Sequence, residues 1–324
     1  MLAQRRVLRY GGQEIERTPL LVPSFSSRVP EIDKILKASE EFLDGPLLVS
    51  AYDIYHQKIT PPFDFGSIVI FLDSGGYEVS RQLDLSEVED QTDAGRRGWS
   101  EEFHSEILTT WKSRLPTVVV SYDHPNERHP LTEQIKRASR LAEGRTDILR
   151  ELLIKPETPN QKYIQFESVL KAVRDFDIFD AIGLTEKEIG NSILMRMENI
   201  ARLRVALTKA GLETPIHIFG SLDTVTTLFY FIAGADIFDG LTWLRYAYSD
   251  GLTLYRQNFG VLEYGFSMKT AAVEALCWAA NHSYLKDLQL EMRRFLKAAD
   301  FSVFEHHRTE LQAAFRSISE SLGV

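Results

Sequence analysis

The segment Ile68-Val-Ile-Phe-Leu-Asp73 is a short run of apolar and β-branched residues that ends abruptly on a carboxylate. Such a run, bounded by turn-forming residues, predicts a buried β-strand. The next residues, Ser74-Gly-Gly-Tyr-Glu78, leave the strand through a glycine-rich turn. A second segment, Gly234-Ala-Asp-Ile-Phe-Asp-Gly240, repeats the pattern and ends on Asp239. Asp73 and Asp239 are therefore the leading candidates for a catalytic pair.

Eight segments of this kind occur along the chain, and most are separated by stretches with helical periodicity. The predicted strands are Leu20–Ser24, Leu47–Tyr52, Ile68–Asp73, Val118–Asp123, Tyr163–Gln165, Asp180–Gly183, Ile216–Gly220 and Ala235–Asp239. Helical patterns between them include Glu31–Phe42, Leu131–Leu153, Ser192–Lys209 and Leu222–Ala233. Strands that alternate with helices indicate a parallel sheet.

Eight such units predict an α/β fold, a closed (β/α)8 TIM barrel that covers residues 1–258. An open doubly wound sheet shows the same alternation and is the alternative. Leu252–Tyr264 has the pattern of a hairpin. Residues 259–324 are predicted to form C-terminal helices, Met268–Ala298 and Phe301–Leu322, that pack on the barrel.

Polar residues end several of the predicted strands. In a closed barrel the catalytic groups lie at the C-terminal ends of the strands. Five strand-end residues would converge there as three carboxylates, an amide and a glycine, namely Asp73, Asp123, Gln165, Gly183 and Asp239. Each also has a structural interpretation, because strand-end aspartates cap helices and buried polar groups commonly bond to the backbone.

Composition narrows the function further. The net charge of −9 argues against attraction of the whole surface to nucleic acid, and no glycine-rich phosphate loop or dinucleotide fingerprint occurs, so no nucleotide cofactor is expected. Cys277 is the one cysteine, which excludes a disulfide framework. The start Met1-Leu-Ala-Gln-Arg-Arg6 lacks the features of a secretory signal and no stretch is apolar enough to span a bilayer, so we expect a cytoplasmic protein that does not enter membranes.

The histidines offer weaker signals. His124 and His129 flank a loop, but no third ligand lies at a suitable spacing for a metal. His217 lies within an apolar strand and is predicted to be a hydrogen-bonded core histidine rather than a base.

Several segments resemble, in the same order, motifs of the tRNA-guanine transglycosylase family. Asp73-Ser-Gly-Gly-Tyr77 is similar to that family's Asp-Ser-Gly-Gly-Phe signature, and Gly234-Ala-Asp-Ile-Phe-Asp239 resembles the segment that carries its nucleophile. Shorter matches are Arg17-Thr-Pro-Leu-Leu-Val-Pro23, Ser121-Tyr-Asp123, Ile164-Gln165 and Ile182-Gly-Leu184. The resemblance extends from Thr18 to Tyr264 and implies a pentosyltransferase that exchanges bases.

The resemblance implies that Asp239 attacks the anomeric carbon of a nucleoside and that Asp73 assists proton transfer near the departing base. A carboxylate suits this role, because it forms a sugar ester that a second base can displace with net retention. Asp123, Gln165 and Gly183 would hold the purine, with Asp123 accepting from N1–H and the 2-amino group of guanine. The other predicted substrate-binding residues are Ser74, Leu184, Tyr77 and Tyr52, of which the tyrosines would stack on a flipped base.

The sequence also departs from the family pattern. Where the family carries a three-cysteine zinc motif, this chain has Ala272-Val-Glu-Ala-Leu-Cys277, so no structural zinc is predicted. The basic segment after the nucleophile is reduced to Arg245. Arg96 and Arg97, in the loop Ser80–Ser100 with Trp99, are further candidate nucleic-acid contacts, or part of a solvated turn.

These departures leave the polymer open. The predicted partners are DNA or tRNA and free guanine or a 7-deazaguanine base, and the subgroup that inserts 7-deazaguanine into DNA is similar in plan. Two other functions stay open, a glycoside or nucleoside hydrolase that uses the same carboxylates, and a noncatalytic subunit that binds a base or a partner. Loss of the zinc motif also suggests a different homodimer or a heteromeric partner protein.

Overall fold

A closed barrel of eight parallel β-strands forms the centre of the computed structural model, which describes residues 1–61, 68–80, 98–141 and 143–323. The strands are β3 (Leu20–Phe25), β4 (Leu47–Ser50), β5 (Ile70–Asp73), β6 (Thr117–Val120), β7 (Leu149–Ile154), β8 (Ala181–Thr185), β9 (Ile216–Phe219) and β10 (Ile237–Gly240). Neighbours in the chain pair in order, and β10 pairs with β3 to close the ring, with Asp239 opposite Val22. The predicted TIM barrel is confirmed.

The fifth barrel strand is not where the sequence analysis placed it. The predicted strand Tyr163–Gln165 is wrong, because these residues precede a helix that begins at Phe166. The strand is β7, which comes from the end of the predicted helix Leu131–Leu153. That helix ends at Ser139.

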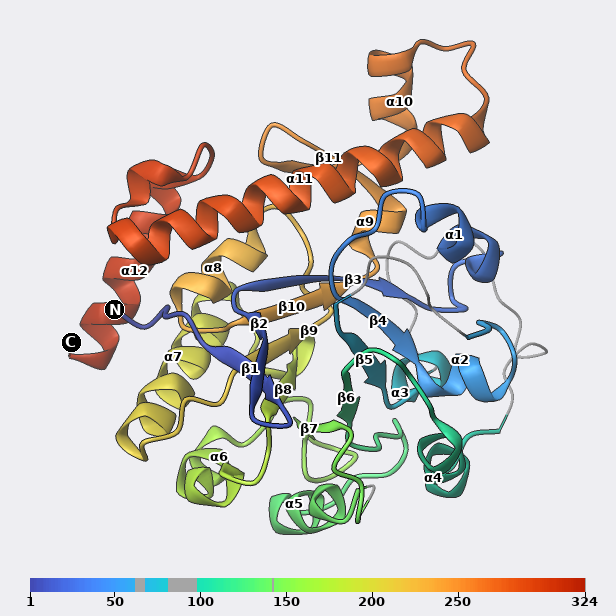
Figure 1. Ribbon diagram of the computed structural model, residues 1–324. Coiled ribbons are helices and arrows are strands. Elements are labelled where there is room, and N and C mark those ends of the chain that lie inside the picture. The colour runs from blue at the N-terminus through green and yellow to red at the C-terminus, as the bar shows by residue number, and fades with distance from the viewer. Residues whose placement is uncertain (62–67, 81–97, 142, 324) are drawn as a thin grey trace.

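Helices and helical turns follow the strands and cover the outside of the barrel (Figure 1). They are α1 (Ile32–Ser39), α2 (Ala51–Tyr55), α3 (Gly76–Val79), α4 (Glu101–Thr110), α5 (Leu131–Ser139), α6 (Phe166–Lys171), η2 (Val173–Phe176), η3 (Glu186–Glu188), α7 (Ile193–Lys209) and α8 (Thr226–Ile232). Helix α7 begins with a side-chain cap, in which the Ser192 hydroxyl accepts a hydrogen bond from the N–H of Met195.

The chain after the barrel forms the predicted helical extension. It contains α9 (Thr242–Arg245), β11 (Tyr246–Ser249), β12 (Leu252–Tyr255), α10 (Arg256–Tyr264), α11 (Thr270–Ala298), η4 (Phe301–Val303) and α12 (Arg308–Leu322). The predicted hairpin Leu252–Tyr264 has the wrong bounds. The hairpin is formed by β11 and β12, and the rest of the predicted segment is helix α10. Figure 1 shows α11 lying across the barrel and α10 projecting from it. Neither α11 nor any other described helix combines the length and apolar character needed to cross a membrane.

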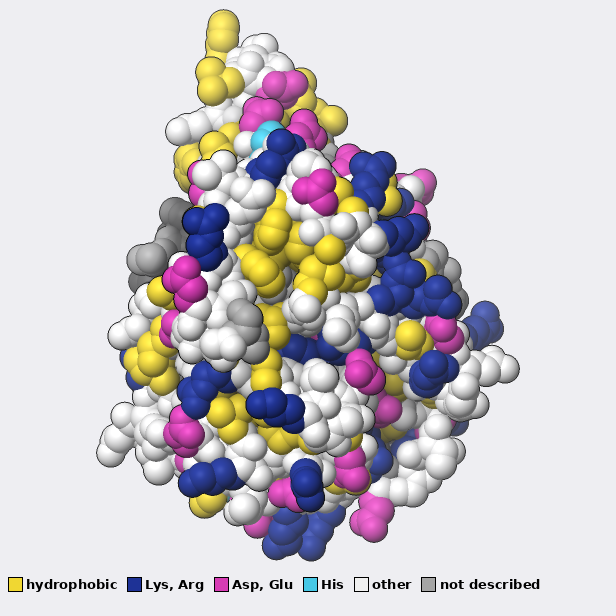
Figure 2. Space-filling view, turned by 90° about the vertical axis from the view of Figure 1, so that its left-hand side faces the viewer, with side chains coloured by type: hydrophobic (Ala, Val, Ile, Leu, Met, Phe, Trp, Pro, Cys, Tyr) yellow, Lys and Arg dark blue, Asp and Glu magenta, His cyan; other side chains and the backbone are white. Residues whose placement is uncertain are grey.

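A hairpin of β1 (Val7–Tyr10) and β2 (Gln13–Arg17) covers the end of the barrel where the strands begin. Its Leu8, Tyr10 and Ile15 pack against the apolar cluster inside the barrel. Figure 2 views the molecule from the left-hand side of Figure 1, where α7, α12 and both ends of the chain lie, and there acidic and basic side chains surround a central group of hydrophobic ones. The candidate site lies at the end of the barrel away from this hairpin, where the strands finish.

Side chains alternate between the two faces of each barrel strand. On β5, Phe71 packs inside the barrel, whereas Leu72 packs in the apolar layer between the strands and the helices. Because the period is two, Asp73 shares the inner face with Phe71. By the same rule, Asp239 shares the inner face of β10 with Ile237. The alternation therefore brings both candidate aspartates to the barrel axis.

A buried ionic cluster fastens the N-terminal segment to the beginning of β10. Asp236 accepts from Arg6 Nη1 at 2.8 Å and also pairs with Arg204, and all three side chains are about 1% exposed. Arg204 Nε donates to the carbonyl of Gly234 at 3.0 Å. Gly234 has φ +106°, and a Cβ there would lie 2.8 Å from Arg204. The conspicuous Gly234-Ala-Asp-Ile-Phe-Asp239 segment thus contains a structural aspartate as well as a candidate catalytic one.

Replacing Asp236 with alanine should lower the free energy of unfolding by about 3–5 kcal/mol, because two buried guanidinium groups lose their carboxylate. Urea denaturation followed by circular dichroism measures this change. Glu213→Gln is the matched control: Glu213 contacts Arg6 at 3.6 Å, but its side chain is 68% exposed, so a change within about 0.5 kcal/mol is expected. Equal stability of the two variants would contradict a structural role for Asp236.

Candidate active site

Asp73 and Asp239 occupy the C-terminal ends of β5 and β10, at the mouth of the barrel. The two residues are only 8% and 5% exposed. Their charges interact, because the Asp239 carboxylate contributes to the shifted pKa of Asp73. The structure therefore brings the two predicted catalytic residues into one site.

Asp239 is surrounded by hydrogen-bond donors. The Ser24 hydroxyl on β3 donates to Oδ2 at 2.7 Å, and the N–H of Gly220 donates to Oδ1 at 3.1 Å. His217 Nε2, on β9, lies 3.3 Å from Oδ1. Asp239 is thus an oriented carboxylate with one oxygen held by fixed groups and the other by a rotatable hydroxyl.

Asp73 has the opposite environment. Burial, together with the negative charges of Glu78 and Asp239, raises the pKa of Asp73 to about 8. The N–H of Gly75, which donates to Oδ2 at 3.3 Å, offsets part of the rise. Asp73 therefore holds a proton at neutral pH, as a general acid must.

Two more buried carboxyl groups, Glu78 and Asp53, lie on α3 and α2, the helices that follow β5 and β4. Glu78 accepts from the Ser26 hydroxyl at 2.6 Å and from the Ser50 hydroxyl at 2.9 Å. Burial raises the pKa of Glu78, and it raises that of the fully buried Asp53 well above its ordinary value. The site is thus lined by carboxyl groups that compete for protons, because close carboxylates cannot all ionise in a dry environment. The sequence analysis missed both residues.

A charged pair inside the barrel, below Asp239, was also missed. Glu151 on β7 and His217 on β9 are fully buried, and His217 Nδ1 bonds Glu151 Oε1 at 2.8 Å. Burial alone would lower the pKa of His217, but the carboxylates of Glu151 and Asp239 raise it to about 9. His217 is a buried, hydrogen-bonded histidine, as predicted, but it also contacts the candidate nucleophile. Glu151 was missed because the predicted helix Leu131–Leu153 covers most of β7, Leu149–Ile154.

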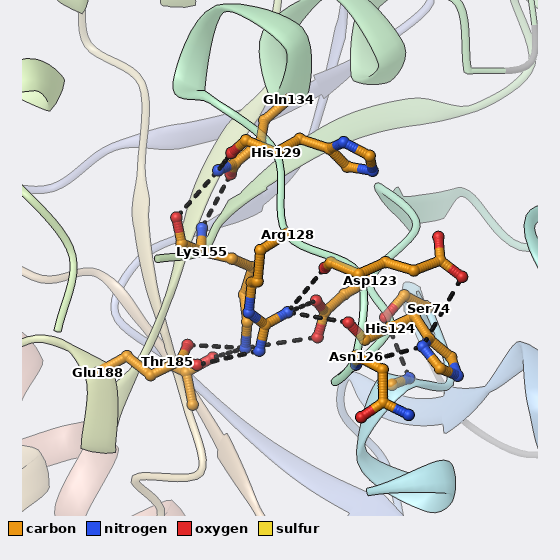
Figure 3. Close-up of polar contacts among 12 residues, drawn as sticks. Ser74, Asp123, His124, Asn126, Arg128, His129, Gln134, Lys155, Thr185 and Glu188 are labelled. Atoms are coloured by element: carbon orange, nitrogen blue, oxygen red, sulfur yellow. Dashed lines mark hydrogen bonds and ion pairs between the residues drawn. The ribbon is translucent and has the colours of Figure 1, made fainter. Parts of the chain in front are cut away.

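Asp123 belongs to a second polar cluster at the mouth, shown in Figure 3. Arg128 Nη1 donates to Asp123 Oδ1 at 2.8 Å, and Lys155 Nζ lies 3.4 Å from Oδ2. Lys155 also contacts Glu188 at 2.7 Å and donates to the Thr185 hydroxyl at 3.0 Å. Burial disfavours the ammonium charge, yet Asp123 and Glu188 raise the pKa of Lys155. Asp123 is therefore a paired carboxylate with cations on both oxygens.

Three other predicted base contacts have different surroundings, and their contact with a base stays a prediction. Gln165 is exposed beside the start of α6, and Lys155 is the residue that follows the fifth strand instead. Leu184 is fully buried in the layer between strands and helices, so it does not face the site. Gly183 is paired on both sides within β8, and a Cβ there would lie 2.6 Å from Phe219. Its small size makes room for neighbours inside the barrel.

Aromatic residues support the turn after Asp73. The Trp99 indole N–H donates to the carbonyl of Ser74 at 2.9 Å, and Tyr52 meets Trp99 edge to face at 5.6 Å. Tyr52 is 3% exposed and Trp99 is 7% exposed. Both rings are buried in the free protein, and the stacking of Tyr52 on a base stays a prediction. Ser74 itself is buried beside Gly76, whose N–H approaches its hydroxyl at 3.4 Å.

Tyr77 lies between two arginines. The Arg28 guanidinium is 4.4 Å from the centre of the Tyr77 ring, and Arg245 Nη2 donates to the Tyr77 hydroxyl at 3.1 Å. Arg245 is half-buried at the end of α9. The other two predicted nucleic-acid contacts, Arg96 and Arg97, lie outside the described residues. Arg28 is a basic neighbour of the site that its sequence context did not reveal.

Gly183→Ala should lower stability by about 1–3 kcal/mol, because the added methyl group would collide with Phe219 and lie 2.9 Å from Glu151 Oε1. Thermal unfolding measures this effect, and Gly45→Ala is the control because a Cβ at Gly45 meets nothing within 4 Å. A Gly183→Ala protein as stable as the control would show that the barrel interior has spare room there.

No protein-family model and no curated protein matches this chain. The chemistry of the site must therefore be argued from its own residues.

Proposed function

We propose that the protein is a base-exchange transglycosylase that replaces a guanine base in a nucleic acid by a 7-deazaguanine-type base, through a covalent bond between Asp239 and the sugar. The observation that carries the proposal is the pair of carboxyl groups in opposite environments: a protonated Asp73 beside an Asp239 surrounded by donors. Two carboxyl groups whose environments separate acid from nucleophile are the usual equipment for cleaving a glycosidic bond.

The steps balance without a cofactor. Oδ2 of Asp239 would attack the anomeric carbon, since Ser24 can rotate its hydroxyl away while Gly220 continues to hold Oδ1. The carbon–nitrogen bond breaks, its electron pair goes to the departing base, and Asp73 supplies the proton. The incoming base then returns a proton to Asp73 and displaces the ester, which regenerates the Asp239 carboxylate.

The cluster around Asp123 supports a base with a ring N–H beside a carbonyl. A carboxylate accepts hydrogen bonds and an ammonium donates them. Asp123 and Lys155, which lie 3.4 Å apart at the mouth, would accept from N1–H and donate to O6 of guanine. Adenine has the reverse pattern on that edge, with an acceptor at N1 and a donor at its 6-amino group. Lys155 takes the place in this proposal that the sequence analysis gave to Gln165.

Arg28, Tyr77 and Arg245 support a polymeric substrate. Guanidinium groups pair with phosphate oxygens, and a tyrosine ring can stack on a base. All three residues are half-buried and both arginines contact Tyr77, which would hold a strand close to the site. A base in a duplex or a stacked loop would be flipped into the barrel mouth before reaction.

The first test incubates the protein with radiolabelled guanine and, separately, tRNA or double-stranded DNA, and measures label in the recovered polymer. We expect incorporation with the wild-type protein and a loss of about 10⁴-fold or more with Asp239→Asn, because the nucleophile is removed. Asp250→Asn, an exposed aspartate in the β11–β12 turn, is the matched control and should retain activity.

The polymer that gains label identifies the substrate. Base released without incorporation would indicate the hydrolase instead, since water would then accept the sugar. Wild-type incorporation that persists in Asp239→Asn would remove Asp239 as the nucleophile. Absence of both exchange and release with either polymer would reject the proposed activity.

Activity should also fall as pH rises through about 8. Asp73 is the proton donor in its protonated form, and its pKa is raised to about 8, so the active form is lost above that pH. The measurement is kcat/KM for guanine incorporation between pH 6 and about 9.5. A bell-shaped profile or a falling alkaline limb reports the pKa values of the essential groups in the free enzyme. Asp73→Asn should react about 10²–10⁴-fold more slowly and lose this alkaline limb. An unchanged limb in that variant would assign it to another group.

A further inference from the structure

The buried chain of contacts Glu151–His217–Asp239 has no role yet in the proposed reaction. His217 Nδ1 bonds Glu151 Oε1 at 2.8 Å, and its other ring nitrogen, Nε2, lies 3.3 Å from Asp239 Oδ1. His217 Nε2 is buried and makes no hydrogen bond of good geometry in the free protein. Contacts of this kind commonly tighten when substrate binds. The imidazole thus has one fixed bond and a second ring nitrogen that lies beside the candidate nucleophile.

Packing fixes the ring in this orientation. The Phe219 ring stacks on His217 with centres 4.0 Å apart, and Phe71 meets it edge to face at 5.4 Å. Gly183 has no side chain that would displace Phe219 or Glu151. The imidazole can therefore neither turn away from Asp239 nor reach solvent, and it is 0% exposed.

The charges explain why a histidine can occupy this apolar layer. Inside a TIM barrel, bulky branched residues usually fill these positions. A single buried imidazolium would be costly, but Glu151 and Asp239 face it from opposite sides and hold its proton. When Asp239 becomes a sugar ester it loses its charge, and Glu151 remains as the partner of the imidazolium. The buried pair therefore stays neutral overall throughout the exchange.

We propose that His217, held by Glu151, is the positioning residue of Asp239: it fixes Oδ1 so that Oδ2 faces the sugar, and it stabilises the carboxylate that is released when the incoming base displaces the ester. This inference rests on the proposed function. His217 touches neither the base nor the sugar and acts through Asp239. Glu151 acts one step further away, by keeping His217 protonated and aligned.

The kinetic test compares His217→Gln and Glu151→Gln with the wild-type protein. Both variants should exchange guanine about 10²-fold more slowly, as expected for a misplaced reacting group. Calorimetric binding of free guanine should be unchanged, because neither residue contacts the base. His282→Gln is the matched control: His282 also faces an aspartate, with Nε2 3.7 Å from Asp44 Oδ1, but it lies on α11 away from the site. Circular dichroism and urea denaturation confirm that each variant is folded.

A second readout does not require any exchange activity. Nuclear magnetic resonance of ¹⁵N-labelled histidine side chains should show that His217 keeps its proton up to about pH 9 in the wild-type protein. Loss of either carboxylate should move its titration to lower pH, so Glu151→Gln and Asp239→Asn should both lower the pKa of His217. His282→Gln should leave the His217 signal in place.

The outcomes separate the two proposals. Full exchange activity in His217→Gln overturns the positioning role while the proposed function stands. The same conclusion follows if the pKa of His217 is unchanged in both Glu151→Gln and Asp239→Asn. If the wild-type protein exchanges no base, the proposed function fails, and the His217 titration still decides whether Glu151 and Asp239 hold the imidazolium. Equal losses of guanine binding and exchange in His217→Gln would indicate a role in shaping the pocket and would also overturn positioning.

Discussion

The two-residue alternation of side chains along the barrel strands is the constraint on which the site depends. It places Phe71 and Asp73 on the inner face of β5, and Ile237 and Asp239 on that of β10. In the lower part of the barrel the inward residues are mainly apolar and fill the interior, whereas toward the mouth they become carboxyl, hydroxyl and ammonium groups. One geometric rule thus produces both a packed core and a polar site above it.

The same rule explains what the sequence could predict. Runs such as Ile68–Asp73 and Ile216–Gly220 are mostly apolar, and such runs predict buried parallel strands. The fifth strand was missed because Arg150 and Glu151 interrupt its apolar run. Glu151 shares the inner face of β7 with Leu149 and Leu153, and its partner there is His217, 66 residues later. No local pattern carries that information.

The base pocket shows a different limit. Gly183 and Leu184 were both expected to contact the base, yet neighbours on a strand face opposite sides, so the pair could not both do so. That correction was available from the sequence. The role of Lys155 could not be predicted from the sequence. It depends on where β7 ends, because Lys155 is the residue that follows this strand. The motifs around Asp73 and Asp239 were more informative because each directly ends a strand.

The segment Gly234–Asp239, which resembles a transglycosylase motif, contains two aspartates with different contacts. Asp236 and Asp239 are three positions apart, but Asp236 pairs with Arg6 and Arg204, whereas Asp239 faces Ser24 and His217. Similarity over such a segment is therefore not evidence about chemistry until the two aspartates are separated. In the proposed function, only the second of them reacts.

The crowded carboxyl groups also affect how ligands will be detected. Asp53, Asp73 and Glu78 compete for protons in a dry pocket, and a ligand that changes the charge or hydration of one changes the proton affinity of the others. Protons will then pass between the protein and the buffer as a ligand binds. The heat released on binding will differ between buffers with different ionisation enthalpies, such as phosphate and Tris. Calorimetry in several buffers can thus count the protons that the site takes up or gives away.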